Sequence, residues 1–227
     1  MNSYALIVAG GSGSRMAADV PKQFLLLNGK PILMRTIEVF HQFNSNIKII
    51  LVLPKPHHEY WAKLCIEHSF DIKHSIVGGG ETRFQSVLNG LNTINDISHC
   101  IVAIHDGVRP LVSNQTLENC FNAAIATGNA VPCVDLIDSI RVVENNKSKH
   151  VNRENYKAIQ TPQVFNFGLL RRAYTMRYNP SFTDDASVLE AAGLLINLVE
   201  GNRENIKITT PTDLIIAEAF IKNQRPE

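Results

Sequence analysis

The sequence has no long apolar run and no excess of charge of one sign. No stretch of about 18 apolar residues occurs, which excludes a helix that spans a bilayer, and we expect no membrane partner. Lysine and arginine total 22 against 21 aspartates and glutamates, a formal net charge of +1. A nucleic-acid-binding protein normally carries a larger basic excess. We therefore expect no nucleic-acid partner, and any anion-binding site must be local.

Cysteine is scarce and scattered. The four cysteines stand singly, without a C-x-x-C pair, at Cys65, Cys100, Cys120 and Cys133. They are too few for a disulfide scaffold in a chain of 227 residues. The first residues, MNSYALIVAGG, lack the basic segment of a signal peptide and reach glycines after a short apolar run. We expect reduced thiols in a soluble, cytoplasmic protein.

The motifs of several common enzyme classes are absent as well. The eight histidines have no metal-binding spacing, and neither H-E-x-x-H nor G-x-S-x-G occurs, which disfavours zinc catalysis and a serine hydrolase. The glycines near the N-terminus lack the third glycine of G-x-G-x-x-G and the G-K-[ST] of a P-loop. A dinucleotide-binding dehydrogenase and a P-loop ATPase are therefore disfavoured too.

What the sequence does have is the composition and periodicity of an α/β protein. Hydrophobic residues make up 44% and charged residues 19%, with a mean hydropathy of −0.04, which is typical of a folded globule. Short β-branched runs alternate with longer segments of helical period. Strands are predicted at Ala5–Ala9, Ile47–Leu53, Ile72–Val77, Cys100–His105 and Leu195–Val199. Helices are predicted at Ile32–Phe43, His57–Ser69, Thr82–Thr93, Asn114–Thr127, Phe167–Arg177, Asp184–Ala192 and Thr212–Lys222.

This alternation predicts an α/β fold with a doubly wound, mostly parallel sheet, in a single domain over residues 1–227. The first four strands should be buried on both faces, because helices cover both sides of such a sheet. Ligands bind beyond the carboxyl ends of its strands. The residues that carry chemistry are therefore expected at that edge.

Residues 138–156 follow a different pattern. They alternate, are rich in charge, and have a turn predicted around Glu144–Lys149. The pattern predicts a protruding β-arm. A two-stranded arm is marginally stable alone and usually packs on another surface, so we expect a partner subunit.

A glycine-rich loop follows the first predicted strand. Ala9 to Met16 reads AGGSGSRM, and backbone amides in such a loop can approach a phosphate closely. Arg15 offers a planar fork for phosphate oxygens and Lys22 a point charge, a combination that stabilises charge in phosphoryl or nucleotidyl transfer. The structural alternative is a plain tight turn with solvated surface charges.

Two further strand ends carry polar motifs. Gly78–Arg83 follows a predicted strand, and Thr82 should cap the helix that contains Ser86. This loop could grip a base or a sugar, or it could be only a flexible connection. Asp106 follows the next predicted strand with Arg109 three residues on. The pair could hold Mg²⁺ and an anionic substrate, or Asp106 could cap the turn and pair with Arg109.

Two C-terminal segments are also candidates. Lys207 lies in a short apolar run read as a strand, where its amine needs an anion or water. Thr183 is predicted to cap a helix with Asp184 and Asp185 in its first turn, and either aspartate could instead be catalytic.

Seven motifs in order resemble one known family. They are LIVAGGSGSRM, PKQF, GGGETRFQSV, HDGVRP, TPQVF, TDDASVLEAAG and EGNRENIKITTPTDL. Together they resemble the 2-C-methyl-D-erythritol 4-phosphate cytidylyltransferase family of the non-mevalonate isoprenoid pathway, from about Ala5 to Ala219. The resemblance implies a Rossmann-like nucleotidyltransferase fold, a homodimer through the arm, and the use of CTP with Mg²⁺ to make a CDP-alcohol and pyrophosphate.

The resemblance also implies roles for individual residues. The nucleotide would be bound by Ala9, Gly10, Gly11, Gly13, Gly80, Glu81, Ser86, Asp106 and Gly107. Asp106 would hold the metal, and the catalytic cations would be Arg15, Lys22 and Lys207. The polyol phosphate would be bound by Arg109, Ser139, Thr161 and Thr183 together with Arg153. Arg153 would reach from the arm into the partner's site.

Five residues depart from the commoner family pattern, namely Gly10, Glu81, Gly107, Val108 and Ser139. Two alternatives to a methylerythritol enzyme remain. A sister family of ribitol 5-phosphate cytidylyltransferases shares the glycine loop, PKQF and H-D-x-x-R-P, whereas TDDAS and GGGETRFQSV are closer to the methylerythritol enzymes. A non-catalytic nucleotide-binding module is the other alternative. It is disfavoured because a degenerate site would be expected to lose clustered charges that are costly to keep.

Overall fold

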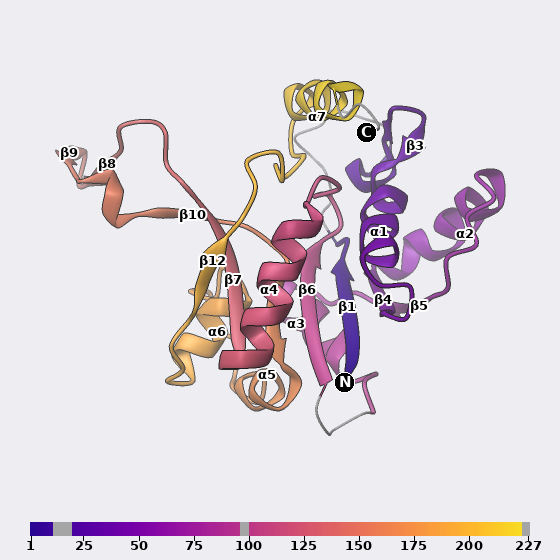
Figure 1. The fold of residues 1–227 in the computed structure, drawn as a ribbon, viewed down its shortest axis with the longest axis horizontal. Coiled ribbons are helices and arrows are strands. Elements are labelled where there is room, and N and C mark those ends of the chain that lie inside the picture. The colour runs from indigo at the N-terminus through magenta and orange to yellow at the C-terminus, as the bar shows by residue number, and fades with distance from the viewer. Residues whose placement is uncertain (11–19, 96–99, 224–227) are drawn as a thin grey trace.

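The structure is a computed structural model that describes residues 1–10, 20–95 and 100–223. Its main sheet is built from eight strands: β1 (Asn2–Val8), β4 (Lys48–Leu53), β5 (His74–Gly78), β6 (Cys100–Asp106), β7 (Asn129–Asp135), β10 (Lys157–Ile159), β11 (Gln163–Asn166) and β12 (Leu198–Glu200). Their order is β10-β7-β11-β6-β1-β4-β5, with β12 also paired to β7 (Figure 1). The predicted α/β fold with a mostly parallel sheet is confirmed.

The parallel block β6-β1-β4-β5 carries the strand ends that matter for function. Ala5 in β1 is in register with Ala103 of β6 and Ile49 of β4. The prediction of burial on both faces is correct for β1, β4 and β6 but wrong for β5. That strand lies at the edge of the sheet, so Ser75 and Ile76 remain exposed.

Strands β7 and β11 were not predicted. Strand β11 runs antiparallel to both neighbours and lies between β6 and β7. Pro132 interrupts the donor pattern of β7, and β11 is only four residues long and begins with the buried Gln163. Both features weaken a strand signal read from sequence.

Seven helices are described: α1 (Ile32–Phe43), α2 (His58–Glu67), α3 (Arg83–Leu91), α4 (Asn114–Thr127), α5 (Phe167–Ala173), α6 (Asp185–Ala191) and α7 (Pro211–Asn223). Helices α1, α2 and α4 pack in one apolar cluster with one face of the sheet, and α3, α5 and α6 pack with the other face. None of them is long and apolar enough to cross a membrane.

Short elements complete the chain. They are the 3-10 helices η2 (Lys22–Phe24), η3 (Lys55–His57) and η4 (Arg153–Asn155), and the two-residue strands β2 (Leu26–Leu27) and β3 (Lys30–Pro31). A third apolar cluster joins Ala217 of α7 to Val108 and Ile208 near the carboxyl ends of the parallel strands. Helix α7 thus lies over this edge of the sheet (Figure 1).

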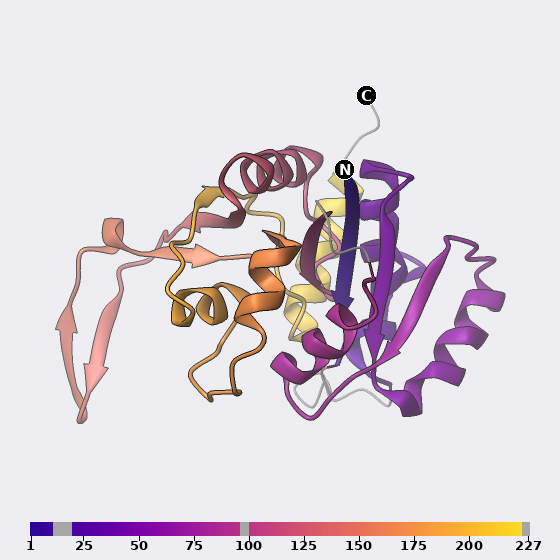
Figure 2. The same cartoon turned by 90° about the horizontal axis from the view of Figure 1, so that it is seen from below.

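The predicted arm is present. Strands β8 (Arg141–Glu144) and β9 (Lys147–His150) pair only with each other among the described strands, and all their residues are exposed. Asn145 and Asn146 form the turn with φ angles of 48° and 62°, the left-handed conformation that two-residue hairpin turns favour. Figure 2 shows the hairpin standing away from the body of the protein.

Candidate functional site

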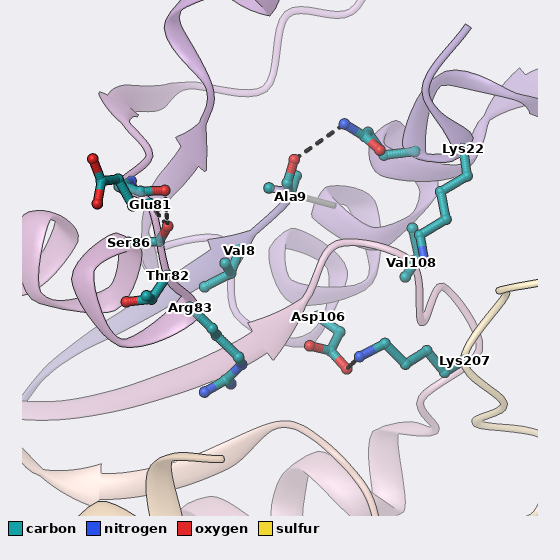
Figure 3. A pocket seen from close by; sticks show the side chains of 13 residues that line it. Val8, Ala9, Lys22, Glu81, Thr82, Arg83, Ser86, Asp106, Val108 and Lys207 are labelled. Carbon is teal, nitrogen blue, oxygen red and sulfur yellow. Dashed lines mark hydrogen bonds and ion pairs between the residues drawn. The ribbon is translucent and has the colours of Figure 1, made fainter. Parts of the chain in front are cut away.

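A pocket of about 230 Å³ lies at the carboxyl ends of β1, β5 and β6 (Figure 3). Thirteen residues line it: Val8, Ala9, Gly10, Lys22, Gln23, Gly80, Glu81, Thr82, Arg83, Ser86, Asp106, Val108 and Lys207. The pocket thus lies at the edge of the sheet where the site residues are expected. Eight of the predicted site residues meet here, namely Ala9, Gly10, Lys22, Gly80, Glu81, Ser86, Asp106 and Lys207.

Asp106 is the acidic group at the floor of the pocket. It ends β6, is 8% exposed, and its Oδ2 lies 3.0 Å from Lys207 Nζ and 3.2 Å from Arg109 Nε. Burial alone would raise the pKa of this carboxyl, but the positive charges of Lys207, Arg83 and Arg109 lower the pKa well below its usual value. Asp106 is therefore ionised at neutral pH.

Two buried side chains support Asp106 from behind. The Thr161 hydroxyl accepts from the Asp106 backbone N–H at 3.1 Å and lies 3.0 Å from His105 Nδ1. His105 Nε2 lies 2.9 Å from the Arg109 carbonyl, which can only accept, so Nε2 carries the proton and Nδ1 accepts from Thr161. Burial lowers the pKa of His105 to about 4, which keeps the ring neutral.

The first glycine turn is held by backbone contacts. Ala9 N–H donates to the Val52 carbonyl at 2.9 Å, and Gln23 Nε2 donates to the Ala9 carbonyl at 3.1 Å. Gly107 N–H donates to Val8 at 2.9 Å. A Cβ at Gly107 would lie 3.0 Å from the Ala9 Cβ, so glycine allows this loop to approach β1 closely.

The second glycine turn is organised by α3. The Thr82 hydroxyl accepts from Gln85 N–H at 3.0 Å and caps the helix, as predicted. Ser86, one turn later, accepts from Gly80 N–H at 3.0 Å. Gly90 lets α3 pack closely on β1, because a Cβ there would lie 2.6 Å from Leu6 Cδ1.

Lys22 is placed by the residues that follow it. Phe24 is 3% exposed, and its ring centroid lies 5.1 Å from that of Tyr60 and 6.2 Å from that of Trp61. Gln23 bonds to Ala9 as described, so a buried aromatic and a buried amide fix η2 and leave Lys22 at the pocket wall.

Arg83 lines the pocket but was not predicted. Its Nη1 and Nη2 lie 2.8 and 2.6 Å from the two carboxylate oxygens of Asp185, and Tyr174 donates to Asp185 at 2.6 Å. Figure 3 shows Arg83 and Lys207 on opposite sides of Asp106. The sequence signal for Arg83 was its place directly after a capping threonine in a glycine turn.

Other predicted residues lie around or away from the pocket. Arg109 and Thr161 contact Asp106, Gly107 packs beneath Ala9, and Thr183 is exposed two residues before Asp185. Ser139 is exposed beside the arm, and Arg153 is exposed there and bonds to the Ile137 carbonyl. Gly11, Gly13 and Arg15 fall outside the described residues.

Two local predictions are wrong. Residues 205–209 do not form the expected strand, so Lys207 extends from an irregular segment. The N-cap of α6 is Asp184 rather than Thr183, because the Asp184 carboxylate accepts from Ser187 N–H while the Ser187 hydroxyl accepts from Asp184 N–H. That reciprocal pair is a capping box, which Thr183 could not form with the same register.

The donor chemistry of the pocket can be compared with what a metal needs. Within the described ranges no group of three or more His, Cys, Asp or Glu side chains is placed to hold an ion. Mg²⁺ commonly binds through only one or two carboxylates and completes its ligands with substrate phosphates and water. The ionised carboxylate of Asp106 fits that mode.

Comparison with known proteins agrees with this geometry. Residues 3–223 match the family described as 2-C-methyl-D-erythritol 4-phosphate cytidylyltransferase. A Bacteroides fragilis protein of that name is 54% identical over 217 residues, which cover 96% of this chain and 98% of the relative.

Solved structures give the same result. The 4-diphosphocytidyl-2C-methyl-D-erythritol synthase from Anaerococcus prevotii aligns with a TM-score of 0.82 at 26% identity over 98% of this chain and 99% of that one. The Francisella tularensis 2-C-methyl-D-erythritol 4-phosphate cytidylyltransferase aligns with a TM-score of 0.80 at 32% identity over 96% and 99% of the two chains. The chain belongs to the 2-C-methyl-D-erythritol 4-phosphate cytidylyltransferase family.

Proposed function

We propose that this protein joins CTP and 2-C-methyl-D-erythritol 4-phosphate to give 4-diphosphocytidyl-2-C-methyl-D-erythritol and pyrophosphate. Family membership over residues 3–223 supports the class of reaction. The observation that carries the proposal is the ionised Asp106 held between Lys207 and Arg109 beside two glycine turns. A carboxylate suited to a metal and cations suited to phosphates then share one pocket.

The proposed reaction is an in-line displacement. A phosphate oxygen of the polyol phosphate attacks the α-phosphorus of CTP, and a new P–O bond forms as the bond to the bridging oxygen of the β-phosphate breaks. Pyrophosphate leaves with that electron pair, and no covalent enzyme intermediate is needed. Because both reactants are anions, positioning and positive charge must supply most of the rate.

The catalytic cations are Lys22, Lys207 and Arg15. Lys22 and Lys207 line the described pocket, and Arg15 is assigned by its place in the glycine-loop motif. The attacking phosphate is already deprotonated near neutral pH, so the reaction needs no general base. His105 is not a candidate for one, because Thr161 and Arg109 occupy both of its ring nitrogens.

Asp106 is the residue that would hold Mg²⁺. Its carboxylate is kept ionised by the surrounding cations, and all its ion pairs among the described residues fall on Oδ2. When bound, the metal would neutralise phosphate charge and favour departure of pyrophosphate.

The nucleotide is assigned to the two glycine turns. Ala9 and Gly10 form one side of the pocket, and Gly80, Glu81 and Ser86 form the other. Close backbone approach at these turns suits a base, a sugar and a phosphate chain. Gly107 supports the first turn from below, and Gly11 and Gly13 complete it by motif.

The polyol phosphate is assigned by motif to Arg109 and Thr161, which contact Asp106, and to the exposed Thr183. Ser139 and Arg153 complete this set from the arm, which points away from the body of its own chain (Figure 2). The proposal therefore includes a homodimer in which Arg153 of one chain serves the pocket of its partner.

The test is release of pyrophosphate from CTP with Mg²⁺, measured with methylerythritol 4-phosphate and with ribitol 5-phosphate in parallel. Lys22→Ala is the blank. Preference for methylerythritol 4-phosphate is expected. Preference for ribitol 5-phosphate would replace the substrate and keep the reaction type, whereas CTP binding without pyrophosphate release from either would overturn the enzymatic proposal.

A further inference from the structure

The position of Lys207 is not explained by its ion pair. The Lys207 side chain is 44% exposed, although its Nζ lies 3.0 Å from Asp106 Oδ2. An ion pair with one partner this exposed contributes little by itself, because water screens it and the long side chain loses entropy. Lys207 also lies outside any strand, so no ladder of hydrogen bonds fixes its backbone.

The residue two positions earlier supplies the missing attachment. Asn205 is 0% exposed. Its Nδ2 donates to the Thr161 carbonyl at 2.8 Å and lies 3.4 Å from Gln160 Oε1. Its own carbonyl accepts from Arg109 Nη1 at 2.7 Å. One buried residue thus contacts both Thr161 and Arg109, the two groups that also touch Asp106.

The orientation of this amide follows from its partners. The Thr161 carbonyl can only accept a hydrogen bond, so the atom facing it must be the NH₂ of Asn205. Asn205 Oδ1 then lies buried without a hydrogen-bond partner among the described atoms. A buried acceptor without a donor is unfavourable for stability. The unpaired Oδ1 of Asn205 therefore lowers stability, and the side-chain contacts described for Asn205 are made by its NH₂ group.

On the far side of Lys207 the backbone is fixed again. Ile208 N–H donates to the Val108 carbonyl at 3.0 Å, and Ile208 is fully buried. Lys207 therefore lies between two fixed residues, Asn205 and Ile208. Asn205 bonds to Arg109 and Ile208 bonds to Val108, and both partners lie in the loop after β6. The backbone around Lys207 is thus fixed relative to the loop that follows Asp106.

We infer that Asn205 is a positioning residue, which holds Lys207 and Arg109 in fixed relation to Asp106 through its contacts with Thr161 and Arg109. The inference deepens the proposed function and rests on it for the role of Lys207 in transfer. Asn205 does not touch substrate. It acts through the atoms that do.

The test compares Asn205→Ala and Asn205→Asp with Asn129→Ala. Asp keeps the size of the side chain but turns a carboxylate oxygen toward the Thr161 carbonyl. Asn129, the first residue of β7, is a matched control because it is also buried, at 3% exposed. Its Nδ2 donates to the Leu195 carbonyl and its Oδ1 accepts from Asn197 N–H. Melting temperature, kcat and KM for CTP are measured for each, together with the ¹³C chemical shift of Lys207 after reductive methylation, assigned with Lys207→Arg.

Both Asn205 variants are expected to lower kcat by roughly 10–100-fold, the size of misplacing a catalytic group, with KM for CTP changed by less than about threefold. Their Lys207 signal should move toward that of the exposed Lys63. Asn129→Ala should lower the melting temperature and leave both kcat and the signal unchanged. If Asn205→Ala does not fold, Asn205→Asp carries the test.

Equal losses of kcat in the Asn205 and Asn129 variants at similar melting temperatures would overturn the inference, as would an unmoved Lys207 signal in a folded Asn205 variant. Failure of the proposed function is distinguishable from this result. In that case the wild-type protein releases no pyrophosphate, while the chemical shift still reports whether Asn205 positions Lys207.

Discussion

The pocket and the arm are built in opposite ways. In the pocket, Asp106 is 8% exposed and is held by Lys207, Arg109 and Thr161, which come from segments far apart in the sequence. In the arm, every residue of β8 and β9 is exposed, and among the strands that the structure describes these two pair only with each other. The fold of a single chain therefore fixes the charged side chains of the pocket. A residue of the arm can be held against a ligand only when the arm packs on a second surface.

The largest effect is expected from the buried ion pair at the pocket wall. Asp185→Asn leaves the Arg83 guanidinium without its bidentate partner, which should lower the free energy of unfolding by about 3–5 kcal/mol. Urea denaturation measures this. Asp135→Asn, in the exposed pair with Lys157 at the base of the arm, is the control and should leave the midpoint nearly unchanged. Similar midpoints for the two variants would contradict the expected difference in stability between the buried pair at the pocket and the exposed pair at the arm.

The next effect is a pH dependence of stability. The pKa of His105 is lowered from 6.5 to about 4 in the folded state. Between pH 4 and pH 6.5 the unfolded chain therefore binds a proton at this histidine that the folded chain does not. Stability should be complete above about pH 6.5 and fall by about 3 kcal/mol in total as the pH drops toward 4.

Urea denaturation between pH 7 and pH 4 measures this slope. His105→Gln should remove this part of it, and His150→Gln, on the exposed strand β9 of the arm, should keep it. A wild-type slope that survives His105→Gln would assign the effect to other groups.

A catalytic effect follows. Lys22→Ala should lower kcat by at least about 10²-fold, equivalent to about 2.7 kcal/mol, because one preorganised cation is lost from the transition state. Steady-state pyrophosphate release measures kcat. Lys147→Ala, on the arm hairpin, removes the same side chain from an exposed strand and should leave kcat unchanged. Near-normal turnover by a folded Lys22→Ala variant would remove Lys22 from the proposed mechanism.

The smallest effect is expected when a variant of the arm is mixed with a variant of the pocket. Arg153→Ala and Lys22→Ala should each be impaired alone. If Arg153 serves the partner's pocket, an equal mixture after exchange of subunits should regain about a quarter of the wild-type sites, since half the dimers then hold one intact site. Size-exclusion chromatography with light scattering checks the dimer. No regain of activity in a mixture shown to exchange would place Arg153 outside the partner's site.

Much of the fold could be predicted because its signals are local. The runs at β1, β4 and β6 are apolar enough to identify buried strands, and Thr82 caps the helix that it was expected to cap. The hairpin was predicted from its alternation, its charge and a turn around Glu144–Lys149, and the structure places the turn at Asn145 and Asn146. These features depend on neighbours in sequence, so the sequence displays them directly.

The features that were missed depend on contacts between distant residues. Arg83 and Asp185 are 102 residues apart, and neither motif alone indicates that they pair. Asn205 reaches Thr161 only because β11 places Thr161 at the carboxyl end of β6. Lys207 was read as part of a strand because apolar neighbours flank it, whereas tertiary anchors hold that segment without a ladder.

The antiparallel direction of β11 has a consequence for engineering this protein. Because β11 runs against β6, the residues before it lie at the pocket edge and the residues after it, where Asn166 caps α5, lie at the opposite edge. Loops at the opposite edge connect elements without facing the pocket. A circular permutant opened between Ser45 and Asn46, which are both exposed in the loop before β4, or a reporter domain inserted there, should therefore keep its ligand chemistry, whereas the same operation beside Thr161 should abolish it.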